Sequence, residues 1–185
     1  MADPICELGC DAELPLVDFD DCNPEVSLSE IRKVYVGKAI SAPFTDWTDP
    51  SEWAARLSET STTGDDYIRP LTVIGDLPAA TNREKVISND RRVVTGKDRT
   101  INFEIDESTD ANYDFLRQLE CGVTVKRKVW FETMGNKLFG GNYGIDMYLT
   151  GNIVLDRGTD GIERYLFIGT WQSKFSPERT ISPIA

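Results

Sequence analysis

The chain has 185 residues, of which 40% are hydrophobic and 28% charged, as in an ordinary soluble domain with one core. It contains no histidine, which excludes Ser-His-Asp and Cys-His catalysis and most catalytic zinc sites. The formal net charge of −11 argues against a conventional nucleic-acid reader, which needs a basic face for phosphate contacts.

Most of the net charge lies in an N-terminal arm, residues 1–29. The first thirty residues hold nine carboxylates and no lysine or arginine, whereas residues 31–185 carry 22 acids and 20 bases. Such a segment buries too little apolar surface to offset its ordering entropy alone. We therefore expect the arm to become ordered on a neighbouring subunit. Its carboxylates, including Asp18, Asp20 and Asp21, would then face basic groups or a DNA-repelling surface.

The body, residues 30–176, is expected to be mainly β, because apolar and polar residues alternate in runs bounded by turn residues. The first predicted strand spans 31–37. A short helix at about 50–58 follows, with Asp49 as its N-cap. Trp53 lies on the apolar face of this helix, which should cover a sheet edge or a barrel end.

Three further strand segments are predicted before the second helix. The segment 67–75 reads as a strand, and its proline indicates an edge or a bulge. Residues 82–97 favour a short projecting hairpin that turns at Ser88-Asn89-Asp90. The alternation of apolar and polar residues over 101–105 predicts a half-buried strand.

A second helix is predicted at about 109–121, with its N-cap at Ser108 or Thr109 and its end at Gly122. Its inward stripe contains Leu116 and Leu119. At its C-terminal end Cys121 is interpreted as a small buried side chain.

The last strands follow this helix. They are predicted at 123–132, 144–156 and 162–175, and the last two should pair as a hairpin through the turn at 157–161. Residues 177–185 are expected to form a short tail that lies on the surface of a neighbouring subunit. The order of elements indicates an antiparallel β-barrel or sandwich with one packed helix.

Three cysteines of the arm, Cys6, Cys10 and Cys22, are weak candidates for a metal site. Their spacing is not that of a zinc finger. A disulfide within the arm is the second alternative, and burial of free thiols is favoured over both. The segment 18–23 resembles a calcium loop but lacks its glycine and terminal glutamate. No cofactor and no catalytic residue is expected.

Basic and aromatic side chains supply the candidates for contacts between subunits. The densest basic group suits strand edges or salt bridges to a neighbour, where it would meet the carboxylates of the arm. An aromatic residue in a loop of small polar residues is a common interface anchor, although a sugar-stacking site would look alike. The interface candidates in the body are Trp47, Lys126, Arg127, Lys128, Trp171 and Phe175.

Several short sequence segments of the body together resemble structural proteins of tailed bacteriophages and prophages. The resemblance covers most of residues 30–182, and the size and order of elements are similar to those of tail tube proteins. No catalytic residue carries over. The segments lie at 30–35, 44–49, 74–76, 101–106, 112–122 and 171–177.

This resemblance implies a non-enzymatic virion subunit, assembled in the host cytoplasm. In tail tube proteins, hexameric rings stack around a channel whose acidic lining lets DNA slide without sequence readout, and arms or long loops join the rings. The partners would be copies of the chain and other virion proteins, with no membrane. The cysteine-containing acidic arm departs from that pattern. The alternatives are a capsid auxiliary, head-completion or packaged virion protein, and a carbohydrate- or metal-binding module.

Overall fold

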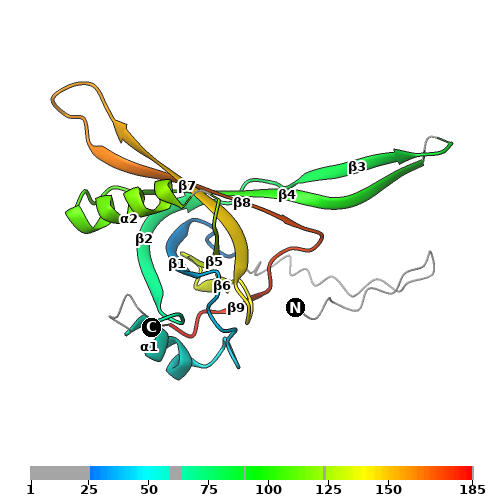
Figure 1. Cartoon of the computed structure of the whole chain (residues 1–185), viewed down its shortest axis with the longest axis horizontal. Coiled ribbons are helices and arrows are strands. Elements are labelled where there is room, and N and C mark those ends of the chain that lie inside the picture. The colour runs from blue at the N-terminus through cyan, green and yellow to red at the C-terminus, as the bar shows by residue number, and fades with distance from the viewer. Residues whose placement is uncertain (1–25, 59–63, 90, 123, 185) are drawn as a thin grey trace.

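The computed structural model describes residues 26–58, 64–89, 91–122 and 124–184. These residues form a mainly β fold with two helices (Figure 1), which confirms the predicted fold class. The strands are β1 (Ile31–Lys38), β2 (Ile68–Asp76), β3 (Thr81–Ile87), β4 (Arg91–Ile105), β5 (Lys126–Thr133), β6 (Lys137–Phe139), β7 (Ile145–Leu155), β8 (Glu163–Ser173) and β9 (Arg179–Ile181). The helices are α1 (Pro50–Leu57) and α2 (Asp110–Cys121).

Six strands close an antiparallel barrel in the order β1, β2, β4, β8, β7 and β5, with β5 pairing back onto β1. The seam between β2 and β4 is the shortest contact in this barrel, because only Ile74–Asp76 pair with residues 102–104. The part of β2 that contains Pro70 pairs with β1 alone among the described strands. Pro70 therefore occupies the kind of edge position that its missing N–H predicts.

The barrel interior is filled by the alternate apolar side chains of its strands. Ile101 and Phe103 of β4 are buried, and the ring of Phe103 stacks on Phe167 of β8 at a centroid distance of 5.2 Å. Met147 and Leu149 of β7 enter the same core. The period-two patterns in the sequence thus correctly predicted the inward face of the barrel.

Helix α2 packs against the barrel and completes its core. Thr109 caps the helix by accepting a hydrogen bond from the Asn112 amide at 3.2 Å. Leu116 and Leu119 are buried in the main cluster, as their spacing predicted. Cys121 is exposed, so its expected burial is wrong. It follows Leu119 by two residues, which turns it away from the inward stripe of the helix.

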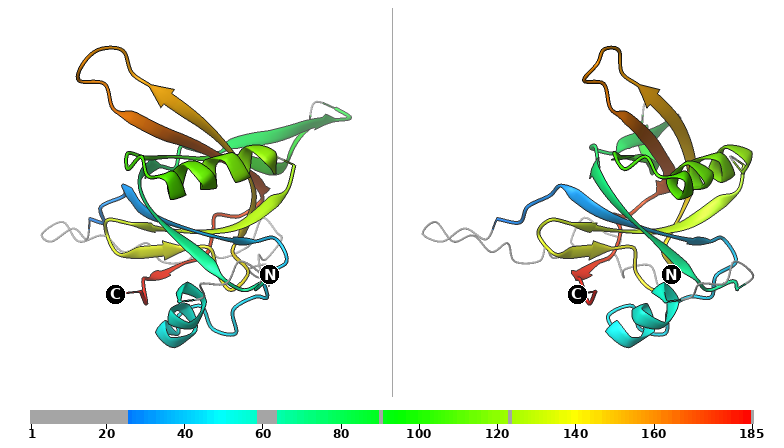
Figure 2. Two further views of the ribbon diagram at one scale, coloured as in Figure 1. Left: turned by 60° about the vertical axis from the view of Figure 1, so that its left-hand side comes forward. Right: turned by 90° about the vertical axis from the view of Figure 1, so that its left-hand side faces the viewer.

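A second apolar layer covers the outside of β1 and β5. Tyr35 and Trp130 lie opposite each other in the ladder and are buried, although the neighbouring pair, Val34 and Phe131, fills the barrel interior. Helix α1 lies over this outer layer. Its Trp53 meets the ring of Trp130 edge to face at 5.7 Å. The two helices lie on opposite sides of the barrel (Figure 2).

The ring of Trp130 lies so close to the turn between β6 and β7 that two positions of the turn must be glycine. A Cβ on Gly140 would come within 2.3 Å of the Trp130 ring, and one on Gly144 within 2.6 Å. Both glycines have positive φ values, of 142° and 68°. The indole N–H donates to the Gly141 carbonyl at 2.8 Å. The turn therefore closes on the face of the tryptophan, and side chains at these glycines would prevent that contact.

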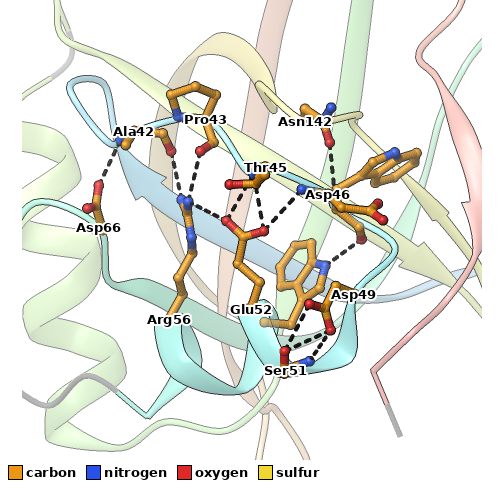
Figure 3. A network of polar contacts seen from close by, with 12 residues as sticks. Ala42, Pro43, Thr45, Asp46, Asp49, Ser51, Glu52, Arg56, Asp66 and Asn142 are labelled. Carbon is orange, nitrogen blue, oxygen red and sulfur yellow. Dashed lines mark hydrogen bonds and ion pairs between the residues drawn. The ribbon is translucent and has the colours of Figure 1, made fainter.

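A polar network joins α1 to the segment 39–49 (Figure 3). Glu52 accepts hydrogen bonds from the Thr45 and Asp46 amides at 3.1 Å and forms an ion pair with Arg56 at 3.0 Å. Burial opposes the ionised form of Glu52, but these donors together lower its pKa below the ordinary value of 4.5. Asn142 accepts a hydrogen bond from the Trp47 amide at 2.9 Å.

Two hairpins extend beyond the barrel. The β3–β4 hairpin projects on one side, and the end of the β7–β8 hairpin projects on another (Figure 1). All seven residues of β3 are exposed. Asn89, at the β3–β4 turn, has a φ of 64°, a conformation that asparagine tolerates well. The predicted turns of both hairpins are confirmed.

The C-terminal segment returns to the body of its own chain. The short strand β9 pairs with β6, which in turn pairs with β5. The predicted tail therefore contains residues that extend the sheet of the same subunit. Among the described helices, neither is long and apolar enough to cross a membrane.

Candidate functional site: an outer groove

A groove of about 1150 Å³ lies on the outside of the barrel. Its floor comes from β4, β5, β7 and β8, and its walls come from the turn before β7 and the segment after β8. The groove contains four of the predicted interface residues. These are Lys126, Lys128, Trp171 and Phe175.

The floor of the groove is a row of residues that lie opposite one another on neighbouring strands. Lys126 pairs with Tyr148, Tyr148 with Thr170, and Thr170 with Thr100. Directly paired residues point to the same face of a sheet, so these four side chains share the outer surface. The Lys126 ammonium lies 5.5 Å from the centroid of the Tyr148 ring, which is a cation–π contact.

Lys128 is held at the edge of this row. Its ammonium lies 3.4 Å from the Asp146 carboxylate and donates to the Tyr143 carbonyl at 3.1 Å. Only 11% of its side chain is exposed, whereas 56% of the Asp146 side chain is exposed. Lys128 is therefore already paired within the subunit, and Lys126 is the more available of the two lysines.

Arg99 lines the groove from the barrel end of β4. Its residue exposure is 9%, and a guanidinium Nη donates a long hydrogen bond of 3.4 Å to Ser176 Oγ. Its buried Nε has no hydrogen-bond partner among the described residues. A buried guanidinium is normally surrounded by hydrogen-bond acceptors. Arg99 can therefore donate further hydrogen bonds to a group that binds in the groove.

The charges in the groove balance. Arg99, Lys126 and Lys128 supply three bases, and three acidic residues face them, namely Asp98, Asp146 and Glu178. Tyr143, Tyr148, Trp171 and Phe175 supply aromatic surface beside these charges. A balanced charge does not select polyanions such as DNA. The combination of aromatic rings with both signs of charge suits a segment of protein chain.

The interface candidates differ in how much surface they leave for a partner. Trp171 is 7% exposed and reaches into the main core, while Phe175 is half-buried beneath the ammonium of Lys174. Arg127 is half-buried and lies outside the groove. Trp47 is 8% exposed and packs in the outer aromatic layer of its own chain. The loop position of Trp47 did not reveal that the loop folds back over β5.

Asp18, Asp20 and Asp21 of the arm lie outside the described residues, as do Cys6, Cys10 and Cys22. In the part of the chain that the structure describes, no three histidine, cysteine or acidic side chains gather as metal ligands would.

Among the described residues, four groups with shifted pKa values lie outside the groove, namely Tyr35, Asp46, Glu52 and Tyr165. Burial, followed by a hydrogen bond to Glu132, raises the pKa of Tyr35 above its ordinary value. A hydrogen bond to Glu163, followed by burial, raises the pKa of Tyr165 to about 12. Each of these phenols, like Glu52 in the α1 network, is engaged with neighbours in the fold. Their shifts therefore follow from structural contacts.

Sequence reasoning missed Arg99, Tyr148 and Asp146 as groove residues. Tyr148 and Asp146 occupy the polar positions of the alternating run in β7, which marks them as outward-facing but not as neighbours of Lys126 and Lys128. Their proximity depends on the β5–β7 register, and that register joins residues 16 to 22 positions apart in the sequence.

Comparisons with protein-family models, curated proteins and solved structures found no match to this chain.

Proposed function

We propose that the protein is a structural virion component of a tailed phage, and specifically a tail tube subunit that assembles into stacked hexameric rings around a DNA channel. The assignment to phage tails rests on the resemblance of the sequence segments. The proposal that the chain assembles with itself rests on two hairpins that extend from the closed barrel. Both hairpins carry exposed aliphatic side chains.

The end of the β7–β8 hairpin carries three such residues. Ile153, Leu155 and Ile162 are 43%, 68% and 60% exposed. On the β3–β4 hairpin, four more are exposed, namely Val86, Ile87, Val93 and Val94. Aliphatic residues gathered on projecting elements favour burial against another surface.

The two hairpins point to different sides of the subunit (Figures 1 and 2). A contact between the hairpin of one copy and a different surface of the next is heterologous, and repeated heterologous contacts close into rings or continue as filaments. The outer groove, with its aromatic rings and balanced charge, is the receiving surface that we assign to such a contact.

The acidic character of the chain fits the same role. The net charge of −11, most of which belongs to residues 1–29, opposes tight binding of DNA, as a channel for passage requires. No catalytic constellation is needed, because the mechanism of a tube is geometric.

Size-exclusion chromatography with light scattering on the purified full-length chain tests the proposal. We expect a species of six times the chain mass of 20.7 kDa, or longer polymers of it. A chain that remains monomeric as its concentration is raised would contradict self-assembly. A defined smaller oligomer that binds capsids would favour the capsid-associated alternative.

A further inference from the structure

The β3–β4 hairpin has two faces that differ in charge. The register places Glu84, Val86, Arg92 and Val94 on one face, and Lys85, Ile87, Arg91 and Val93 on the other. On the first face, Arg92 forms an ion pair with Glu84 at 3.2 Å. On the second, neither Lys85 nor Arg91 has an ion-pair partner among the described residues. We call this second face the cationic face.

The cationic face is also apolar. Ile87 is 39% exposed and Val93 is 44% exposed, and no described element packs on either of them. A two-stranded hairpin is marginally stable alone in water, so a projecting one gains from a third element laid against it. The surface therefore fits a partner that brings both carboxylates and aliphatic side chains.

The N-terminal arm of this chain has that composition. Residues 1–25 contain eight carboxylates and no basic side chain. Residues 13–21, with the sequence ELPLVDFDD, hold four carboxylates and four large apolar residues within nine positions. Since residues 1–25 contain no basic side chain, any ion pair that their carboxylates form must draw its cation from elsewhere in the assembly.

A second copy is the better source of the arm than the same chain. The first described residues, which precede β1, and the tip of the β3–β4 hairpin lie far apart in the left view of Figure 2. In the assembly proposed above, the β3–β4 hairpin extends beyond its own barrel (Figure 1), so a neighbouring copy lies within its reach and can present its arm to the cationic face.

We propose that the cationic face of the β3–β4 hairpin, formed by Lys85, Ile87, Arg91 and Val93, binds the acidic N-terminal arm of a second copy of this chain. This inference rests on the self-assembly proposed above and names the surface and the segment that hold two copies together. The charges bring the arm to the hairpin, and the aliphatic residues of both supply the contact area.

Zero-length carbodiimide cross-linking of the full-length chain tests this contact, because the reagent joins a lysine amine to a carboxylate that touches it. Equal amounts of ¹⁵N-labelled and unlabelled chain are mixed, unfolded and refolded together, and then cross-linked. Mass spectrometry of the digest identifies the pairs. We expect cross-links between Lys85 and carboxylates of residues 1–25 in which one peptide is labelled and the other is not.

Arg91→Glu and Arg92→Glu form a matched pair of variants, since these neighbouring residues lie on opposite faces and both retain Lys85. We expect Arg91→Glu to lower the yield of mixed cross-links about tenfold, because the new carboxylate beside Lys85 would repel the carboxylates of the arm. Arg92→Glu should leave the yield within about twofold of the wild type. Circular dichroism verifies that both variants fold.

Three results would overturn the inference. The first is cross-linking of Lys85 to the arm only within one chain. The second is an equal loss of yield in both variants. The third is an assembly that forms rings without any cross-link between Lys85 and the arm, which would leave the proposed function standing. Mixed cross-links in a dimer that forms no rings would instead support this contact and count against the tube.

Discussion

Tyr35 of β1 donates a hydrogen bond of 2.8 Å to the Glu132 carboxylate of β5 on the outside of the barrel. Both residues are buried, with exposures of 1% and 7%, and Lys33 lies 3.8 Å from the same carboxylate. The strand pair that closes the barrel therefore carries a buried acid on its outer face. That acid depends on a phenol from the neighbouring strand for its hydrogen bond.

Replacing Tyr35 by phenylalanine should lower the free energy of unfolding by about 1–3 kcal/mol, because Glu132 loses its buried donor while the packing volume is kept. Urea unfolding followed by tryptophan fluorescence measures the change. Tyr148→Phe removes a hydroxyl from a side chain that is 41% exposed, and should change stability by less than about 0.5 kcal/mol. Equal effects of the two variants would contradict the assignment.

Glu52 should make the stability of the α1 region depend on pH. Its pKa is lowered in the folded state, so its contribution is present above the ordinary value of 4.5 and is lost as the pH falls through the lowered value. We expect Glu52→Gln to cost about 1–2 kcal/mol at neutral pH, and the difference from the wild type to shrink below pH 4.5. Urea midpoints measured across this range give the comparison.

The control for Glu52 is Glu120→Gln. Glu120 of α2 forms an exposed ion pair with Arg117 at 3.2 Å, and a pair of this kind contributes little to stability. If the difference in unfolding free energy between Glu52→Gln and the wild type stays constant with pH, the negative charge of Glu52 does not stabilise the network.

Gly75 should be intolerant of a side chain because it lies in the short β2–β4 seam of the barrel. A Cβ at this position would come within 2.7 Å of the Asn102 carbonyl oxygen on the paired strand. We expect Gly75→Ala to cost about 1–3 kcal/mol through overpacking. Gly96→Ala, where a Cβ would meet nothing within 4 Å, is the matched control and should be nearly neutral. Thermal unfolding of both variants tests the pair.

Leu155 at the end of the β7–β8 hairpin should matter for association more than for folding. Its side chain is 68% exposed, so Leu155→Asp should leave the unfolding free energy within about 0.5 kcal/mol of the wild type. We expect the variant to associate more weakly in sedimentation velocity, because the aspartate would be buried in the subunit contact. Ile40→Asp changes a similarly exposed aliphatic residue, at 71%, outside both hairpins. Equal association of the two variants would exclude the hairpin from the contact.

The sequence predicted the elements of this fold where local patterns are strong. The alternation of Ile101, Phe103 and Ile105 and the caps at Asp49 and Thr109 each depend on a few neighbouring residues, and the structure confirms them. The three-residue strands β6 and β9 were missed, because a run that short carries no periodic signal.

The layer outside the barrel and the groove were not predictable in the same way. Tyr35 and Trp130 stand at outward positions of their strands, where alternation predicts contact with water. They are buried because the segment 39–49 and α1 fold over them, and nothing in the local pattern of β1 or β5 encodes that cover. Arg99 likewise becomes a groove residue only through the register between β4 and β8.

Negative-stain electron microscopy of the purified full-length chain tests the central proposal most directly. The account predicts closed rings with six subunits and a central channel wide enough for duplex DNA, together with short stacks of such rings at higher concentration. Uniform particles of the size of a single subunit, with neither rings nor stacks at any concentration examined, would contradict it.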